Sequence, residues 1–231
     1  MKKNKIFVAC DTSNLNLVKK IIKHTKTKEL TIIPKFGLQF FYSKQGRKFL
    51  ETFNNDFFLD LKINDIKQTA LSAIDSLKDL KKCRYITVHA NGGLEMLKAV
   101  KKKAKKTNKN LKVLGVTVLT SLNNKSLKEI GHTKTLDQIV LKQAGLIKKS
   151  GLHGVVLSAK EARIVKKKYK NLFIVTPGIR LPGDEINDQA RVVTPYVALK
   201  KNKVNAIVMG RSLIRGNIKK NIKKLIDHLK Q

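Results

Sequence analysis

Two kinds of segment alternate along the whole chain, and this alternation restricts the fold more than any other feature. Short runs rich in β-branched and aromatic residues recur at 6–10, 31–35, 57–61, 85–89, 113–117, 154–158, 173–177 and 206–210. Longer lysine-rich stretches with a helical spacing of apolar residues include 15–22, 66–80, 94–104, 136–149, 159–169 and 218–229. The short runs predict strands and the long stretches predict helices. Such a succession of βα units is the pattern of an α/β protein with a (β/α)8 TIM barrel.

The predicted strands are nearly continuous in apolar residues, as is typical of parallel strands buried on both faces. An open doubly wound sheet gives the same pattern in any single βα unit, and the number of units favours a closed barrel. No linker rich in Pro, Gly or Ser and no break in composition divides the chain. We therefore expect residues 1–231 to form one barrel domain.

The chain is strongly basic, with 50 Lys plus Arg against 16 Asp plus Glu and a formal net charge of +34. Such an excess is one sign of a nucleic-acid-binding protein. Only seven of the basic residues are arginines, and the lysines are spread over the polar faces of nearly all the predicted helices. Base and phosphate recognition favours the arginine fork. We interpret the charge as a solvated lysine-rich surface and expect no nucleic-acid partner.

The number of cysteines and the length of the apolar runs indicate the cellular compartment of the protein. Cys10 and Cys83 are too few for a disulfide framework, and no Cys/His cluster suggests zinc. The apolar run after the basic N-terminus ends at Asp11, which is too short for a signal sequence. No stretch approaches the roughly 18 apolar residues of a membrane span. We expect a cytoplasmic protein without a membrane partner.

Polar and charged residues recur at or just after the carboxyl ends of the predicted strands. They are Asp11, Lys35, Asp60 with Lys62, His89, Thr117 with Thr120, Arg180 and Arg211. Taken singly, Asp11 is explained equally well as a helix cap and His89 as a hydrogen-bonded core histidine. In a barrel, however, these strand ends meet at one mouth, where active sites are built. The recurrence predicts a common site there.

Residues 60–65, with the sequence DLKIND, are the densest part of this set. If the strand continues to Lys62, Asp60 and Lys62 project to the same side and Leu61 packs outward. The alternative is a surface ion pair with Asp65 as a helix N-cap. A lysine between carboxylates stays protonated and suits an acid or an electrostatic anchor. A Schiff-base lysine next to the cation of Lys35, or a magnesium ion on the carboxylates, stays open from the residues alone.

The last two predicted strands end in glycine and arginine. Their sequences are TPGIR at 176–180 and MGRS at 209–212. Loops after strands seven and eight are a frequent phosphate site in barrels, where Gly178 and Gly210 would expose backbone amides and Arg180 and Arg211 would bind bidentately. The pattern predicts a phosphorylated substrate. The long polar segment 181–191 is then predicted to close over the phosphate.

An ordered set of motifs spans essentially the whole chain. It comprises VACD at 8–11, PKFG at 34–37, FLDLKINDI at 58–66, VHANGG at 88–93, LTS at 119–121, TPGIR at 176–180, NDQAR at 187–191 and GRS at 210–212. In this order the motifs resemble the bacterial branch of the orotidine 5'-phosphate decarboxylases. The family usually has a proline where this chain has Lys67.

The resemblance implies the conversion of orotidine 5'-phosphate to UMP and carbon dioxide, the last step of de novo UMP synthesis, with no cofactor and no metal. Lys62 would donate a proton to C6 of the pyrimidine. Lys35, Asp60 and Lys62 would form an alternating charged tetrad with Asp65 of the neighbouring subunit in a homodimer. The remaining implied roles are Asp11 and Lys35 on the ribose hydroxyls, Asp60 and Thr69 among the substrate contacts, Thr120 and Ser121 on the pyrimidine edge, and Arg180, Gln189, Gly210 and Arg211 on the phosphate and its lid.

Two other functions compete with this one. Magnesium-dependent enzymes of the same superfamily, the hexulose-phosphate synthase and keto-gulonate-phosphate decarboxylase types, share the DxKxxD core. They characteristically carry a glutamate where this chain has Lys35, whose cation disfavours a metal ion. A basic RNA-associated protein would need clustered arginines or exposed aromatic platforms, which this sequence lacks.

Overall fold

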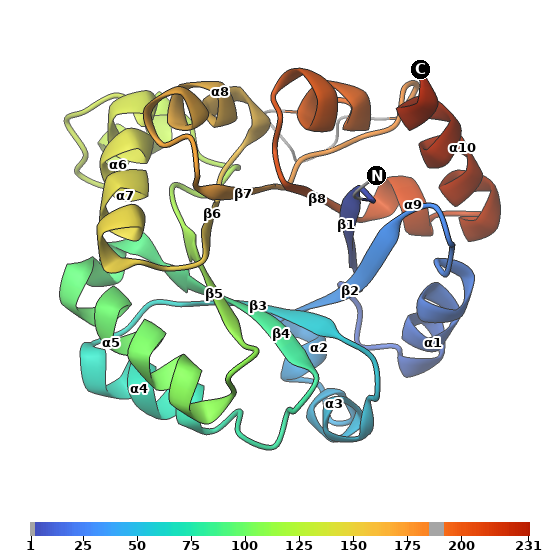
Figure 1. Ribbon diagram of the computed structural model, residues 1–231, viewed down its shortest axis with the longest axis horizontal. Coiled ribbons are helices and arrows are strands. Elements are labelled where there is room, and N and C mark those ends of the chain that lie inside the picture. The colour runs from blue at the N-terminus through green and yellow to red at the C-terminus, as the bar shows by residue number, and fades with distance from the viewer. Residues whose placement is uncertain (1–2, 185–191) are drawn as a thin grey trace.

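The computed structural model describes residues 3–184 and 192–231. Eight parallel strands form a closed barrel in the order of the chain, as Figure 1 shows. They are β1 (Lys5–Ala9), β2 (Thr31–Gly37), β3 (Phe57–Ile63), β4 (Cys83–His89), β5 (Lys112–Val116), β6 (Gly154–Val156), β7 (Phe173–Thr176) and β8 (Ala206–Met209). The predicted (β/α)8 TIM barrel is confirmed, with each strand within a few residues of its expected bounds.

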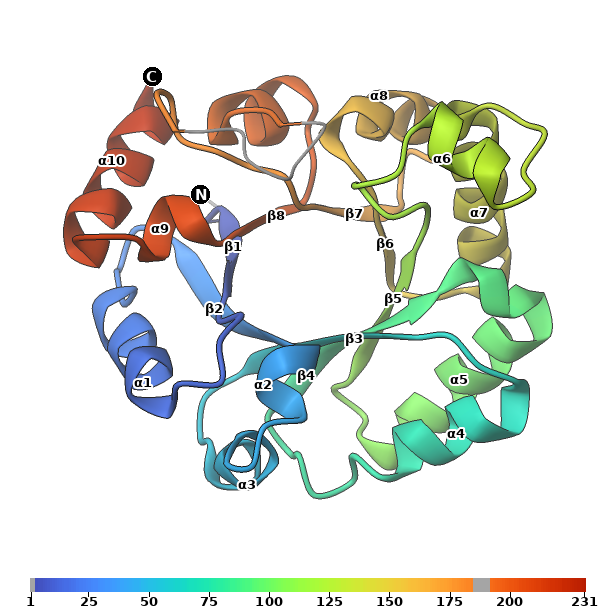
Figure 2. The same cartoon turned by 180° about the vertical axis from the view of Figure 1, so that it is seen from behind.

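Helices surround the ring of strands in both views (Figures 1 and 2). The longer ones are α1 (Leu15–His24), α4 (Lys67–Asp75), α5 (Gly93–Thr107), α7 (Leu136–Ser150), α8 (Ala159–Lys168) and α10 (Ile218–Lys230). All six were predicted, although α4 ends at Asp75 and does not reach residue 80. The hydroxyl of Ser76, the C-cap, donates to the carbonyl of Ala73 and competes with further helical hydrogen bonds.

Shorter helices fill the loops and were not predicted. They are α2 (Leu38–Phe41), α3 (Gly46–Thr52), α6 (Asn124–Glu129), α9 (Arg211–Ile214), the 3-10 turn η1 (Ala90–Gly92) and the π-helical turn η2 (Val197–Lys201). Elements of one or two turns are too short to produce a helical period in the sequence. The helix α2 continues directly from β2 and lies in front of the strands in Figure 2, so that view shows the carboxyl ends of the barrel.

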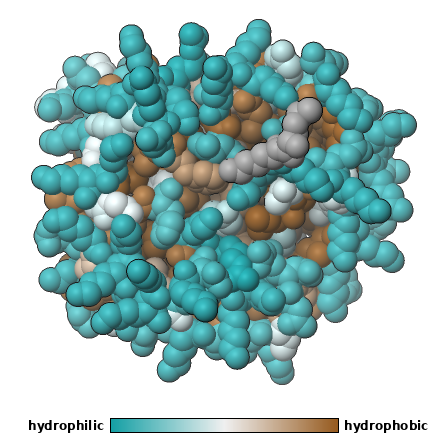
Figure 3. Space-filling model, viewed as in Figure 1, coloured by the Kyte–Doolittle hydropathy of each residue, from teal (hydrophilic) through white to brown (hydrophobic). Residues whose placement is uncertain are grey.

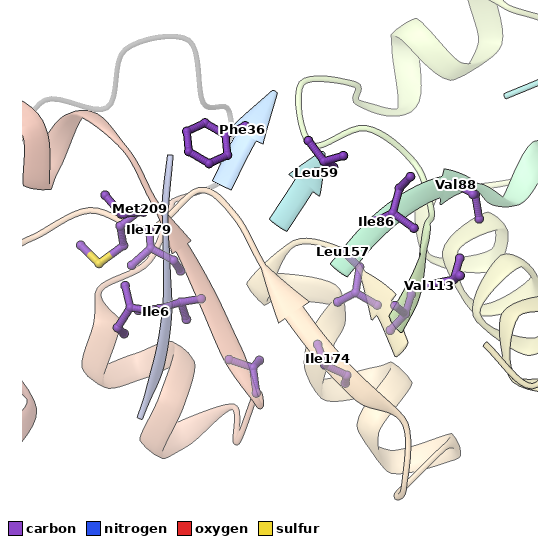
Figure 4. Packing of buried hydrophobic residues seen from close by; sticks show 14 of the residues in the cluster. Ile6, Phe36, Leu59, Ile86, Val88, Val113, Leu157, Ile174, Ile179 and Met209 are labelled. Atoms are coloured by element: carbon purple, nitrogen blue, oxygen red, sulfur yellow. The ribbon is translucent and has the colours of Figure 1, made fainter. Parts of the chain in front are cut away.

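Strand alternation divides the core into two layers. Outward-facing residues such as Ile6, Leu59 and Ile86 pack with residues of the helices, and Figure 4 shows part of this layer. Inside the barrel, the ring of Phe7 lies 4.9 Å from that of Phe58, measured between centroids, and 5.0 Å from that of Tyr85. These edge-to-face contacts close the amino-terminal half of the barrel interior.

In three neighbouring strands, β2, β3 and β4, the inward-facing residues change from apolar to polar toward the carboxyl end. In each of these three strands the change occurs over a single step of two residues. The pairs are Ile33 and Lys35 in β2, Phe58 and Asp60 in β3, and Tyr85 and Thr87 in β4. Because side chains of a strand alternate between its faces, both members of each pair point into the barrel. An apolar layer therefore lies directly beneath a polar one.

The strand β3 is irregular where it carries its charged residues. Leu59 pairs with Ile86 and Ile63 pairs with Val88, so the segment between the two pairs is longer in β3 than in β4. Lys62, within this bulge, has a φ of 49°. The strand therefore continues through Lys62, as the sequence analysis supposed, but it carries a bulge that was not predicted. The bulge arises from pairing with β4, which is not visible in the local sequence.

The surface is largely hydrophilic on the face drawn in Figure 3. In the described part of the chain, no helix has the length and apolar character needed to cross a lipid bilayer.

Candidate active site

Four charged side chains of alternating sign form a continuous row at the carboxyl ends of β1, β2 and β3. The ammonium of Lys35 lies 3.1 Å from Oδ1 of Asp11 and 3.2 Å from Oδ2 of Asp60. The ammonium of Lys62 lies 3.0 Å from the same oxygen of Asp60. The prediction that Asp60 and Lys62 lie on one side of the strand is confirmed, and Leu61 packs against the outer core. We call Asp11, Lys35, Asp60 and Lys62 the charged row.

The middle of the charged row is buried and its ends are accessible. The side chains of Lys35 and Asp60 are 6% and 14% exposed, against 57% for Asp11 and 37% for Lys62. Burial alone would lower the pKa of Lys35, but the attraction of Asp60 and Asp11 outweighs it and raises that pKa. Burial alone would raise the pKa of Asp60, but Lys35 and Lys62 outweigh it and lower that pKa. Both groups are therefore charged at neutral pH.

The absence of a side chain at Gly37 leaves room for the ion pair between Asp11 and Lys35. A Cβ atom on Gly37 would lie 3.0 Å from Oδ1 of Asp11 and 3.8 Å from Nζ of Lys35. The alternative role of Asp11 as a helix cap is wrong, because α1 is capped by Asn14, whose side chain accepts from the N–H of Leu17.

His89 lies at the end of β4, close enough to Lys62 to be affected by its charge. Burial, and then the charge of Lys62, lower the pKa of His89. Its Nδ1 atom accepts a hydrogen bond from the N–H of Asn91 at 3.3 Å. A neutral imidazole at this place adds no further positive charge next to Lys62.

Asp65 and Thr69 follow the charged row in sequence and are exposed to solvent. The carboxylate of Asp65 accepts from the N–H of Ile66 at 2.7 Å, and α4 has Ile66 as its N-cap, so the alternative of Asp65 as the N-cap is wrong. Among residues 3–184 and 192–231, the ion pairs of the charged row do not include Asp65. Lys67 takes the first helical position, where proline is favourable but replaceable.

A cavity of about 300 Å³ lies beside the loops that follow β7 and β8. Its lining includes Arg180 and Arg211, which were predicted to bind phosphate, together with Ser212, Arg215 and Asn221. Arg215 was missed by the sequence analysis, although it follows Arg211 at the four-residue spacing that places side chains on one side of a helical turn. Gly178 has a φ of 75°, a conformation that favours glycine, and Gly210 directly precedes α9. The lining also includes Asp184, so three arginines face one carboxylate and the balance of charge suits an anion.

For the other residues that were predicted to contact the substrate, the structure gives only their place in the fold. Thr120 and Ser121 lie in the turn after β5, at the same end of the barrel as the charged row. Gln189 lies outside the described residues. Within the described ranges, no group of three His, Cys, Asp or Glu side chains is positioned to hold a metal ion. The ammonium of Lys35 occupies the space between the carboxylates of Asp11 and Asp60.

A comparison with protein families finds one family model that matches almost the whole chain. Residues 4–224 match the family model described as orotidine 5'-phosphate decarboxylase / HUMPS family. The chain belongs to this family. Its members include decarboxylases, the class of enzyme predicted from the motifs.

Individual members of the orotidine 5'-phosphate decarboxylase / HUMPS family match over nearly their full length. The chain is 39% identical over 218 residues to an orotidine 5'-phosphate decarboxylase of Carboxydothermus hydrogenoformans, covering 91% of this chain and 89% of the relative. It is 36% identical over 225 residues to that of Buchnera aphidicola, covering 96% and 92%. The crystal structure of the Lactobacillus acidophilus enzyme superposes with a TM-score of 0.84 at 28% identity, covering 99% of this chain and 100% of that one.

Replacing Lys35 by methionine tests the electrostatics of the charged row. We expect the free energy of unfolding near pH 7 to fall by about 3 kcal/mol, because Asp60 loses one of its buried counter-charges. The lowered pKa of Asp60 contributes stability above its ordinary pKa, and this contribution is lost as the pH falls through the folded-state value. The difference between wild type and variant should therefore shrink in acid, as measured by urea denaturation across that range.

The control is Lys102→Met, which removes an exposed lysine of α5. It should change the free energy of unfolding by less than about 0.5 kcal/mol. A loss for Lys35→Met that is equal at all pH values would contradict the argument.

Proposed function

We propose that the protein converts orotidine 5'-phosphate to UMP and carbon dioxide in pyrimidine biosynthesis, as one catalytic domain formed by residues 1–231. The observation that carries the proposal is the charged row, in which the ammonium of Lys35 lies between two carboxylates. It occurs in a chain that belongs to the family and is 39% identical to an orotidine 5'-phosphate decarboxylase.

The order of the strands supports a nucleotide as substrate. In the closed barrel, β7 and β8 are followed by β1, β2 and β3. The anion cavity therefore lies beside Asp11, and Asp11 lies beside the rest of the charged row. A nucleotide has the same succession of phosphate, ribose and base. In this arrangement Arg180, Gly210 and Arg211 bind the phosphate, Asp11 and Lys35 bind the ribose hydroxyls, and Thr120 and Ser121 bind the base. Gln189 lies outside the described residues, and its proposed role at the phosphate follows from the family resemblance.

In the proposed reaction, Lys62 stabilises the charge that decarboxylation produces. The bond between C6 and the carboxylate carbon breaks, and its electron pair remains on C6. The accessible ammonium of Lys62 stabilises this charge and transfers a proton to C6. Asp60, 3.0 Å from the ammonium, favours its protonated form before the reaction. Lys62 then regains a proton from water, so the cycle uses only side chains and solvent.

Two further effects assist this step. The carboxylate of Asp60 is held ionised in the middle of the charged row. In the proposed complex it repels the carboxylate of the substrate, and loss of carbon dioxide relieves that repulsion. Phosphate binding by the arginines contributes energy that positions the base against the charged row.

We also propose a homodimer that completes the site. Leu38, Tyr42 and Ile66 are large apolar side chains exposed just after β2 and β3. Such side chains at one rim are typical of a subunit interface. Asp65 and Thr69, in the segment that follows β3, are also exposed. In the dimer, Asp65 of the partner subunit completes the site at the Lys62 end of the row, and Thr69 is a further substrate contact.

Lys62→Ala tests the proton donor. The absorbance change of orotidine 5'-phosphate should be rapid with wild type in EDTA, and the variant should be slower by about 100- to 10,000-fold, as is typical for loss of a general acid. Lys48→Ala, which removes an exposed lysine of α3, should behave as wild type.

Near-normal turnover of the Lys62 variant would overturn the proton-donor role. Activity of wild type only on a sugar phosphate with magnesium would assign the protein to the synthase side of its family.

Mixed dimers of Lys62→Ala and Asp65→Asn subunits test the shared site. Each parent should be nearly inactive. In a heterodimer, one site carries both changes and the other carries neither, so a statistical mixture should recover about a quarter of wild-type activity. Lys62→Ala subunits mixed with themselves are the control. No recovery in a mixture shown to contain heterodimers would place Asp65 in its own subunit's site.

The lysine-rich surface predicts a salt-dependent capture of the substrate. With a net charge of +34, the protein should attract an anionic nucleotide at long range. We expect kcat/KM to fall by roughly tenfold between low salt and about 0.5 M salt, because ions screen that field. The kcat measured in the same titration is the control and should change little. A flat kcat/KM would contradict electrostatic steering.

A further inference from the structure

Thr87 is a fully buried residue of β4 whose side chain points into the barrel, directly beside the charged row. We propose that Thr87 is a positioning residue for the decarboxylation, and that its hydroxyl sets the geometry of both Lys62 and Asp60. The inference rests on the proposed function for its kinetic part and on the structure alone for its geometric part.

The first observation is the place of Thr87 in the sheet. Leu59 pairs with Ile86 and Ile63 pairs with Val88, so Thr87 is the residue of β4 that faces the bulge of β3. The N–H of Lys62 donates to Oγ1 of Thr87 at 2.8 Å. A side-chain hydroxyl thus accepts a hydrogen bond from the backbone of the bulged strand. The bulge is joined to β4 at the residue that is proposed to donate the proton.

The second observation is the direction of the other hydrogen bond. The hydroxyl of Thr87 donates to Oδ1 of Asp60 at 2.9 Å. A hydroxyl carries a single proton. Because the oxygen of Thr87 accepts from the N–H of Lys62, its one proton is directed at Asp60. The other carboxylate oxygen, Oδ2, stays directed at the ammonium groups of Lys35 and Lys62. Thr87 therefore fixes the rotation of the carboxylate.

The third observation is the backbone of Lys62. Its φ of 49° is a conformation that residues other than glycine rarely adopt and that persists only when surrounding contacts hold it. The hydrogen bond from the Lys62 N–H to Thr87 is such a contact. Without the hydroxyl, the backbone is free to relax and to move the ammonium away from the reacting carbon. Displacements of about 1 Å at a reacting group lower rates on the order of 100-fold.

The experiment compares Thr87→Val, which keeps the shape but lacks the hydroxyl, with Thr87→Ser, which keeps the hydroxyl. We expect Thr87→Val to lower kcat by roughly 10- to 100-fold. KM should change by less than about threefold, because the phosphate arginines follow other strands. Thr87→Ser should retain kcat within about threefold of wild type.

Thr25→Val is the matched control. Thr25 is also buried, and its hydroxyl donates to the carbonyl of Ile21 at the end of α1, outside the charged row. This variant should lower the melting temperature without changing kcat. It separates the cost of losing any buried hydroxyl from the loss of positioning.

Crystal structures of the Thr87 variants provide a readout independent of activity. In Thr87→Val, φ of Lys62 should leave the positive region, or its ammonium should move away from Oδ2 of Asp60. In Thr87→Ser, both should stay as in wild type.

An unchanged kcat and an unchanged Lys62 backbone in Thr87→Val would overturn the inference, and so would equal loss in the serine and valine variants. Inactive wild type would overturn the proposed function instead, and the two crystal structures would then decide the positioning role by themselves.

Discussion

The buried carboxylate of Asp60 is the group on which the organisation of the site depends. It receives an ammonium from β2, an ammonium from β3 and a hydroxyl from β4, namely those of Lys35, Lys62 and Thr87. A carboxylate out of water is costly unless such partners compensate it. Three neighbouring strands must therefore keep their register for the carboxylate to stay ionised. The charge of the site thus depends on the correct pairing of β2, β3 and β4.

The apolar interior of the barrel strengthens this arrangement. Phe7, Phe58 and Tyr85 fill the space beneath the charged row and exclude water from that side. Charges interact more strongly where the surroundings are poorly polarisable. The same packing leaves only the other side open, where Lys62 and Asp11 are accessible. The protein thus carries most of its positive charge on the surface and keeps Lys35 as a buried cation in a defined place.

Charge and topology together support the proposed nucleotide site. The arginines at β7 and β8, the carboxylate after β1 and the charged residues of β2 and β3 follow one another around the barrel. Residues distant in the chain become neighbours because β8 pairs with β1. The structure therefore has a cavity lined by arginines at one end of this arc and a row of alternating charge at the other.

The sequence by itself determined the barrel, because strand and helix periods are local, and it identified Asp11, Lys35, Asp60 and Lys62, because each lies at a strand end. It also placed Arg180 and Arg211 in neighbouring loops. Only the tertiary structure decided the bulge at Lys62, the hydrogen bonds of Thr87 and the place of Arg215. A polar residue in the run 85–89 was the one signal for Thr87. Its partners are 25 and 27 residues away, and contacts across that separation depend on strand register, which local sequence does not encode.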